Sequence, residues 1–342
     1  MKWLRAVVER SWRDRSGWDT AMVKCVTVPL SWVWAGAMAV RNYLHDRRTG
    51  VSVPGVSVVG IGNLAVGGTG KTPLTAWIAR RFVARGHECA VLTSGYGNDE
   101  LLLHQRWNPR VAVYGERDRI AGVRRARAGG AGVVVLDDGF QHRALARDLD
   151  LVLLAVEQRF PGRILPRGPY REPATQLRRA DAVVLTRRIA DRSEAEHFAA
   201  RVEAVAPGVV VGCLALAPGR WLDLAGQEAV APEGPILAVT GIARPHTFLA
   251  DVGVALPEGT DVRLCEFPDH HEYTSEDVER VAAIADEDGR TIVMTEKDAV
   301  KLVGWGRIPT SARVLTSQLS WDWGADRVED LLDRVVGDGG GS

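Results

Sequence analysis

The stretch AVGGTGKT, residues Ala65 to Thr72, decides the fold because it almost matches a phosphate-binding loop. A Walker A motif reads G-x-x-x-x-G-K-[ST]. Gly70, Lys71 and Thr72 fit the end of that motif, whereas Ala65 occupies the position of its first glycine. The flanking residues therefore have to decide whether the stretch binds phosphate or is a glycine-rich turn with an incidental lysine.

The flanking sequence favours a phosphate-binding loop. Its pattern predicts a strand from Val56 to Ile61, a glycine-rich turn, and a helix from Thr72 to Ala84. Such a unit directs backbone N–H groups and the positive end of the helix dipole at an anion. Gly67 and Gly68 supply the backbone freedom that the missing first glycine would give. The predicted phosphate-binding residues are Gly67, Gly68, Thr69, Gly70, Lys71 and Thr72.

A magnesium site is predicted beside this loop. The run VVVLDDG reads as a buried strand, Val133 to Leu136, with Asp137 and Asp138 at its carboxyl end, where ligands bind in open parallel sheets. These carboxylates and the Thr72 hydroxyl are the predicted magnesium ligands, and Lys71 is expected to reach the β- and γ-phosphates. An Asp-Asp-Gly turn ends many strands, so the prediction depends on the loop that accompanies it.

The order of predicted elements indicates the α/β class. From Val51 onward, short apolar strands alternate with longer helical patterns, which is typical of a mainly parallel sheet with helices on both faces. A polar, proline-bearing stretch from Ala217 to Gly234 precedes a second, shorter series of the same kind. We therefore predict an N-terminal helical segment at 1–50, a P-loop domain at 51–230, a smaller α/β domain at 231–336 and a flexible tail at 337–342.

Composition excludes several classes of function. The 342 residues include 43 lysines and arginines and 43 aspartates and glutamates. The chain therefore has no excess of positive charge that would indicate nucleic acid as a partner. The four cysteines are far apart and form no C-x-x-C pair, which predicts neither a zinc site nor a disulfide framework and fits a reducing cytoplasm. Nothing in the sequence indicates an oligomeric state.

The first fifty residues predict contact with a membrane surface. Apolar residues from Trp3 to Trp12 recur at helical spacing among basic ones, as in an interfacial amphipathic helix. A second apolar run, Val26 to Val40, contains Pro29 and falls short of the roughly 20 residues that a transmembrane helix needs. We expect it to lie on the bilayer or dip into it. The alternative is that both helices simply pack on the domain behind them.

Several motifs, in order along the chain, resemble the tetraacyldisaccharide 4'-kinase family. They are IGNLAVGGTGKTP (61–73), GYG (95–97), LDDGFQHR (136–143), RILPRGPYREP (163–173), FPDHHEY (267–273) and TEKDAVKL (295–302). The resemblance implies a kinase that uses ATP and Mg²⁺ to phosphorylate the 4'-hydroxyl of a lipid A disaccharide precursor. It also implies a peripheral or monotopic place on the cytoplasmic leaflet of the inner membrane.

The resemblance also implies roles for particular residues. The family's catalytic aspartate corresponds to Asp99 and its supporting histidine to His270, with Lys71 as the cation of the loop. Arg119 and Arg171 lie in segments that match family motifs and are predicted to supply cations for phosphate groups, with ordinary surface ion pairs as the alternative. Gln141 and His142 follow the acidic pair closely enough to line the same cleft, with a turn position as the alternative for each. From the residues alone, Asp99 reads equally well as the first-turn acid of a helix, and His270 as a surface residue.

Two departures from the family pattern leave alternatives open. Ser94 stands where the family usually has arginine, and the family's insert between G-Y-G and G-D-E is missing before Asn98. A divergent membrane-associated P-loop protein with another acceptor, or with no phosphoryl transfer, is therefore the second hypothesis. A regulatory GTPase is the third, but Thr295 to Asp298 reads T-E-K-D and does not match the guanine-reading [NT]-K-x-D.

Overall fold

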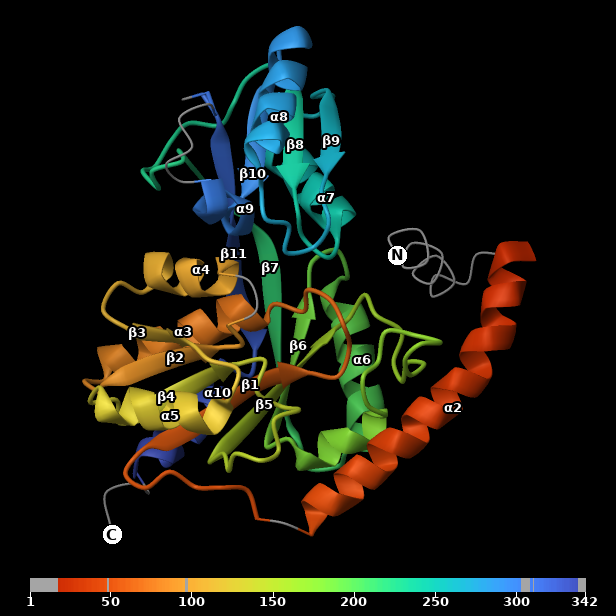
Figure 1. The fold of residues 1–342 in the computed structure, drawn as a ribbon, viewed down its shortest axis with the longest axis vertical. Coiled ribbons are helices and arrows are strands. Elements are labelled where there is room, and N and C mark those ends of the chain that lie inside the picture. The colour runs from red at the N-terminus through yellow and green to blue at the C-terminus, as the bar shows by residue number, and fades with distance from the viewer. Residues whose placement is uncertain (1–17, 48, 96–97, 303–307, 310, 338–342) are drawn as a thin grey trace.

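A single sheet of eleven strands runs through the molecule in the order β3-β2-β4-β1-β5-β6-β7-β11-β10-β8-β9 (Figure 1). The computed structural model describes residues 18–47, 49–95, 98–302, 308–309 and 311–337. Every neighbouring pair of strands is parallel except β7 and β11. The predicted α/β fold class, with a mainly parallel sheet, is confirmed.

The first half of the sheet is buried on both faces at its central strands, whereas its edge strand β3 is partly exposed. Its strands are β1 (Ser57–Asn63), β2 (Cys89–Thr93), β3 (Ala112–Gly115), β4 (Val133–Asp137), β5 (Leu149–Ala155), β6 (Ala182–Arg187) and β7 (Val210–Leu222). In β4, Val133 and Val135 pack toward one core cluster, whereas Val134 and Leu136 pack toward another. This two-sided burial explains why the strands read as continuous apolar runs rather than as alternating patterns.

Helices cover both faces of this half. Residues of α3 (Lys71–Ala84) and α10 (Ala325–Gly337) share one core cluster, and those of α5 (Arg119–Ala128) share another. The helix α6 (Arg192–Val205) packs on β5 and β6 after the short helix η1 (Ala174–Arg179). α4 (Asp99–Trp107) lies at the carboxyl edge of the sheet, below the upper part of the molecule in Figure 1.

The second half extends the same sheet upward in Figure 1. It contains β8 (Ile236–Thr240), α7 (Pro245–Ala255), β9 (Val262–Glu266), α8 (Ser275–Glu287), β10 (Thr291–Thr295), α9 (Glu296–Leu302) and β11 (Arg313–Trp323). The long strands β7 and β11 pair antiparallel over most of their length, from Val314 opposite Leu222 to Trp323 opposite Cys213. This ladder continues the backbone hydrogen bonding from one half of the molecule into the other.

The chain returns to the first half after β11. On α10, Val328, Leu332 and Val335 are buried in the core cluster that also contains α3 residues, and Glu329 forms an ion pair with Arg81. The predicted boundary at residue 231 lies between β7 and β8 and stays a prediction. The packing of α10 nevertheless ties the end of the chain to the P-loop half.

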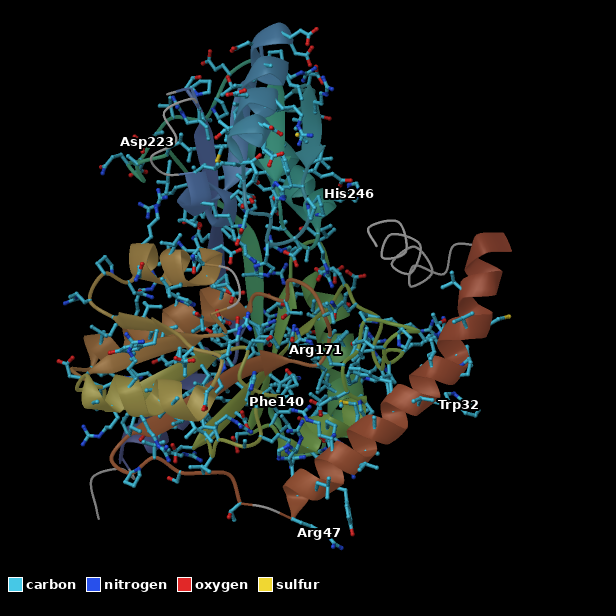
Figure 2. The ribbon with its side chains drawn as sticks, viewed as in Figure 1. Trp32, Arg47, Phe140, Arg171, Asp223 and His246 are labelled. Atoms are coloured by element: carbon cyan, nitrogen blue, oxygen red, sulfur yellow. The ribbon has the colours of Figure 1, made fainter. Side chains whose placement is uncertain are left out.

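The helix α2 (Trp18–Asp46) has an unusual distribution of side chains. Thr27, Ser31 and Asn42 are buried, whereas large apolar residues are exposed. These exposed residues are Val26, Leu30, Trp32, Val33, Trp34, Val40, Tyr43 and Leu44. Figure 2 shows Trp32 on the side of α2 that faces away from the body. Among the described residues, no helix has the length and apolarity to cross a membrane. The helix predicted around Trp3 to Trp12 lies outside the described residues.

Candidate active site

The loop between β1 and α3 has the backbone conformation of an anion site. Gly70 precedes the first turn of α3 with a φ of 84°, and Gly67 has a φ of 112°, values that favour glycine. The fully buried Asn63 donates from Nδ2 to Thr69 Oγ1 at 2.9 Å and to the carbonyl oxygen of Gly67 at 3.4 Å. The side chain of Asn63 therefore braces the loop that Lys71 and Thr72 follow.

A cavity of about 320 Å³ lies between the two halves of the molecule and includes this loop. The first half contributes Gly67 to Thr72, Glu100 and Asp138 to its wall. The second half contributes Arg244, His270 and Lys297, among others. All the predicted phosphate-binding residues thus line one space.

Asp138 connects the loop to the predicted substrate side. Its carboxylate lies 3.5 Å from Lys71 Nζ and 3.1 Å from Arg171 Nη1. Burial raises the pKa of Asp138, but Lys71 and then Arg171 more than offset this effect, so that its pKa lies below the usual value. Arg171 also donates to Gln141 Oε1 at 3.2 Å. Four predicted residues therefore form one connected group beside the cavity.

Asp137 does not belong to that group. Its carboxylate contacts a buried histidine instead. His104 Nε2 lies 3.0 Å from Asp137 Oδ2, and both side chains are buried to within 1% exposure. The second carboxylate oxygen of Asp137 is buried and has no hydrogen-bond partner among the described residues. A buried carboxylate oxygen without a hydrogen-bond partner suits a cation as its partner.

The predicted ligands suit Mg²⁺ better than they suit a metal ion whose ligands all come from the protein. In the part of the chain that the structure describes, no three His, Cys, Asp or Glu side chains are grouped to hold a metal ion. Mg²⁺ usually takes one or two carboxylates and completes its shell with phosphate oxygens and water. Thr72, Asp137 and Asp138 have the oxygen donors that such a site needs, and their role as magnesium ligands stays a prediction.

Asp99 is the centre of a charged cluster that joins the two halves. It is fully buried at the start of α4. His270 Nδ1 lies 3.0 Å from Asp99 Oδ2, while Lys301 Nζ and Lys297 Nζ of α9 lie 3.3 and 3.4 Å from the same oxygen. Burial raises the pKa of Asp99, but the hydrogen bond from His270 and the charges of both lysines outweigh it and hold the pKa below its usual range.

In the second half, hydrogen bonds to a buried aspartate fix the loop that carries His270. The buried carboxylate of Asp298 accepts hydrogen bonds from the Thr240 hydroxyl, the Tyr273 hydroxyl and the backbone N–H of Gly241 at 2.9–3.0 Å. The backbone N–H of His270 donates to the carbonyl oxygen of Gly241 at 3.1 Å. The loops that carry His270 and Arg244 are therefore fixed to the same buried charge.

Two predicted substrate residues have other partners in the structure. Arg119 is buried, and its guanidinium donates to the carbonyl oxygens of Thr93, Glu116 and Asp137. Burial and the neighbouring charge of Arg119 lower the pKa of His142. Contacts of Arg119 and His142 with a substrate remain predictions.

Some residues of the site were missed by the sequence analysis. His104, Lys297 and Lys301 were not predicted, although the lysines stand four residues apart on a helical pattern and so share a face. Glu100, next to the predicted base, also lines the cavity, and burial followed by the charge of Asp137 raises its pKa to about 7. No sequence pattern indicated that His104 would meet Asp137.

Comparison with known proteins identifies the family. The model of the tetraacyldisaccharide-1-P 4'-kinase family, LpxK, matches residues 23–337. The chain belongs to this family. A tetraacyldisaccharide 4'-kinase of Anaeromyxobacter sp. (strain K) is 40% identical over 95% of this chain and 94% of its own length. That of Phenylobacterium zucineum is 35% identical over 98% of this chain and 99% of its own length.

The fold agrees with a solved member of the family. LpxK from Aquifex aeolicus, crystallised in complex with ATP, superposes with a TM-score of 0.70 at 27% identity, covering 90% of this chain and 98% of the other. The resemblance inferred from the motifs is confirmed, and the chain is a kinase. The regulatory GTPase hypothesis is thereby set aside.

Proposed function

We propose that this kinase transfers the γ-phosphoryl group of ATP to the 4'-hydroxyl of a tetraacyldisaccharide 1-phosphate in lipid A biosynthesis. One observation carries the proposal. The pair formed by Asp99 of the first half and His270 of the second lies beside the cavity that contains the phosphate-binding loop. A base next to a phosphate site is the arrangement that phosphoryl transfer to a sugar hydroxyl requires.

In the proposed reaction, Lys71 and the backbone N–H groups of Gly67 to Thr72 bind the phosphates. The 4'-oxygen forms a bond to the γ-phosphorus, the bond from that phosphorus to the β–γ bridging oxygen breaks, and ADP leaves. The hydroxyl proton passes to Asp99. Thr72, Asp137 and Asp138 would hold Mg²⁺, which neutralises charge on the phosphate oxygens.

The cluster around Asp99 supports the proposal that the two halves separate for substrate to enter. Asp99 is fully buried, and His270 and Lys297, which line the cavity, lie against it. His270 receives a hydrogen bond from Lys297 at its Nε2 atom, 3.4 Å away, which leaves its Nδ1 proton to hold Asp99. Opening and closing of the second half would therefore expose the base and reassemble it around the acceptor.

The membrane location is also a proposal, and α2 supports it. This helix has 29 residues, about 43 Å at 1.5 Å per residue, and exposes most of its large apolar side chains. Its polar residues face the body instead, where Asn42 donates to Glu172 and Arg41 to the carbonyl oxygen of Gln141. An exposed apolar face of this kind suits the boundary between headgroups and acyl chains. An enzyme placed there meets a substrate whose acyl chains stay in the bilayer.

The reaction is tested directly with purified protein. Mg-ATP and tetraacyldisaccharide 1-phosphate in detergent are incubated with the wild type and with Lys71→Ala, and mass spectrometry follows the bisphosphorylated product. We expect product from the wild type and at least a 100-fold lower rate from the variant. Folded wild-type protein that binds ATP but forms no product would favour the hypothesis of a different acceptor or of no transfer.

Membrane docking is tested by flotation with vesicles of anionic and zwitterionic lipid. A variant with Trp32→Ser and Val33→Ser, both exposed on α2, is compared with Ile189→Ser, which removes an exposed apolar residue from the body. We expect the α2 variant to lose most of its vesicle binding and the control to keep it. Equal binding of all three proteins would place the docking surface elsewhere.

A further inference from the structure

The second half of the molecule places an arginine directly over the phosphate-binding loop. Arg244 is the residue before α7, at the end of the turn that follows β8. A β-carbon built on Gly67 would lie 3.4 Å from Arg244 Nε and 3.5 Å from Arg244 Nη2. The guanidinium thus lies close to the loop, although Arg244 comes 177 positions after Gly67 in the chain.

The backbone around Arg244 is held firmly. Its carbonyl oxygen accepts hydrogen bonds from the backbone N–H of Thr247 at 3.1 Å and from the Thr247 hydroxyl at 2.7 Å. Pro245 occupies the first helical position of α7, where its fixed φ suits a helix start. Three residues before Arg244, Gly241 is bound to the buried Asp298. The backbone that carries Arg244 is therefore fixed to the second half.

Among the described residues, Arg171, Arg188 and Arg244 are the arginines that line the cavity. Arg171 lies 3.1 Å from Asp138, and Arg188 lies 2.7 Å from Asp251. Arg244 lies beside Gly67, four residues before Lys71 on the predicted phosphate-binding loop. Its planar fork of N–H donors suits phosphate oxygens.

We propose that Arg244 is a catalytic residue that the second half delivers to the transferred phosphoryl group. This inference rests on the proposed kinase function and goes beyond it. As the 4'-oxygen bonds to the γ-phosphorus and the bond to the bridging oxygen breaks, negative charge spreads over the phosphoryl oxygens and the leaving oxygen of ADP. Arg244 donates hydrogen bonds to those oxygens, whereas Asp99 takes the proton. Closure of the two halves thereby couples acceptor binding, through His270, to completion of the charge around the phosphoryl group.

The test uses the full chain and needs no lipid for its first readout. A fluorescent ADP analogue with aluminium fluoride and Mg²⁺ mimics the transition state of phosphoryl transfer. The affinity of each protein for this complex is compared with its affinity for ATP alone. The variants are Arg244→Ala and Arg244→Lys. The control is Arg263→Ala, which removes an exposed arginine of β9, paired with Asp288, from the same half of the molecule. Thermal unfolding is measured for each protein.

We expect Arg244→Ala to weaken the aluminium fluoride complex and kcat by about 10²–10⁴-fold while ATP affinity changes less than tenfold. Arg244→Lys recovers only part of the loss, because lysine lacks the fork, and Arg263→Ala behaves as the wild type. Unchanged trapping by Arg244→Ala, or an equal loss of ATP affinity and trapping, would overturn the proposal. If wild-type protein traps aluminium fluoride through Arg244 but phosphorylates no lipid, the acceptor assignment fails and the role of Arg244 stands.

Discussion

Arg171 joins the helix α2 to the phosphate site through Asp138. Its carbonyl oxygen accepts a hydrogen bond from Trp34 Nε1 of α2 at 3.1 Å, and its guanidinium lies 3.1 Å from Asp138, which in turn lies 3.5 Å from Lys71. The helix proposed to meet the membrane is therefore two residues away from the lysine proposed to bind phosphate. We therefore expect a disturbance at Trp34 to affect the residues proposed to bind phosphate.

Trp34→Phe tests this connection because it keeps an aromatic ring and removes the N–H donor. A typical hydrogen bond contributes about 1 kcal/mol, so we expect kcat/KM in detergent to fall by roughly fivefold. Trp32→Phe is the control, since Trp32 is 75% exposed. Equal activities of the two variants in detergent would mean that α2 does not influence the site through Arg171.

The cluster around Asp99 predicts a pH-dependent stability. Because His270, Lys297 and Lys301 hold the folded-state pKa of Asp99 below its unfolded value of about 3.9, the stabilisation is present above that value. It is lost as the pH falls through the folded-state pKa. At pH 7, Asp99→Asn leaves three cationic or polar partners without their carboxylate, and we expect a loss of about 3–5 kcal/mol.

Thermal unfolding of wild type and Asp99→Asn from pH 7 down to pH 3 measures this effect. The difference in Tm should be largest near neutrality and should shrink below about pH 4. Glu276→Gln is the control, since it removes an exposed carboxylate at the start of α8. A Tm difference for Asp99→Asn that stays constant with pH would argue against an ionised Asp99 in the cluster.

The buried pair of His104 and Asp137 predicts an effect on magnesium. His104→Leu leaves a buried carboxylate without its partner, which typically costs about 3–5 kcal/mol of stability. His104→Gln can still donate a hydrogen bond to Asp137 and should cost less. If His104 orients Asp137 toward the metal, both variants need more Mg²⁺ for half-maximal ATP binding, and the leucine variant needs the most. A magnesium titration of ATP binding that matches wild type in both variants would restrict His104 to a structural role.

Much of the fold could be predicted because it follows from local patterns. Glycine placement and apolar periodicity predicted the strand, loop and helix around Lys71. The alternation of strand and helix patterns predicted the α/β class. The continuous sheet was not predictable in the same way. It depends on the antiparallel pairing of β7 with β11, in which Ala217 pairs with Gln318. No local pattern encodes which of several strands will become neighbours.

The site was predictable only where a motif marked it. Lys71 and Asp138 belong to recognisable motifs and lie together, as Asp99 and His270 also do through the resemblance. His104 and Arg244 follow no motif of that kind. His104 lies on α4, whereas the carboxylate that it meets comes from β4. Such contacts are set by tertiary packing and become visible only in the structure.

The central claim is that Asp99 and His270 act as one unit across the cavity, and a double-mutant cycle tests it most directly. We would measure kcat for phosphoryl transfer to tetraacyldisaccharide 1-phosphate by wild type, Asp99→Ala, His270→Ala and the double variant. The account predicts a loss of about 10²–10⁴-fold for Asp99→Ala, and a double variant hardly slower than that single one. Losses that multiply independently, or an Asp99→Ala enzyme that turns over like wild type, would contradict it.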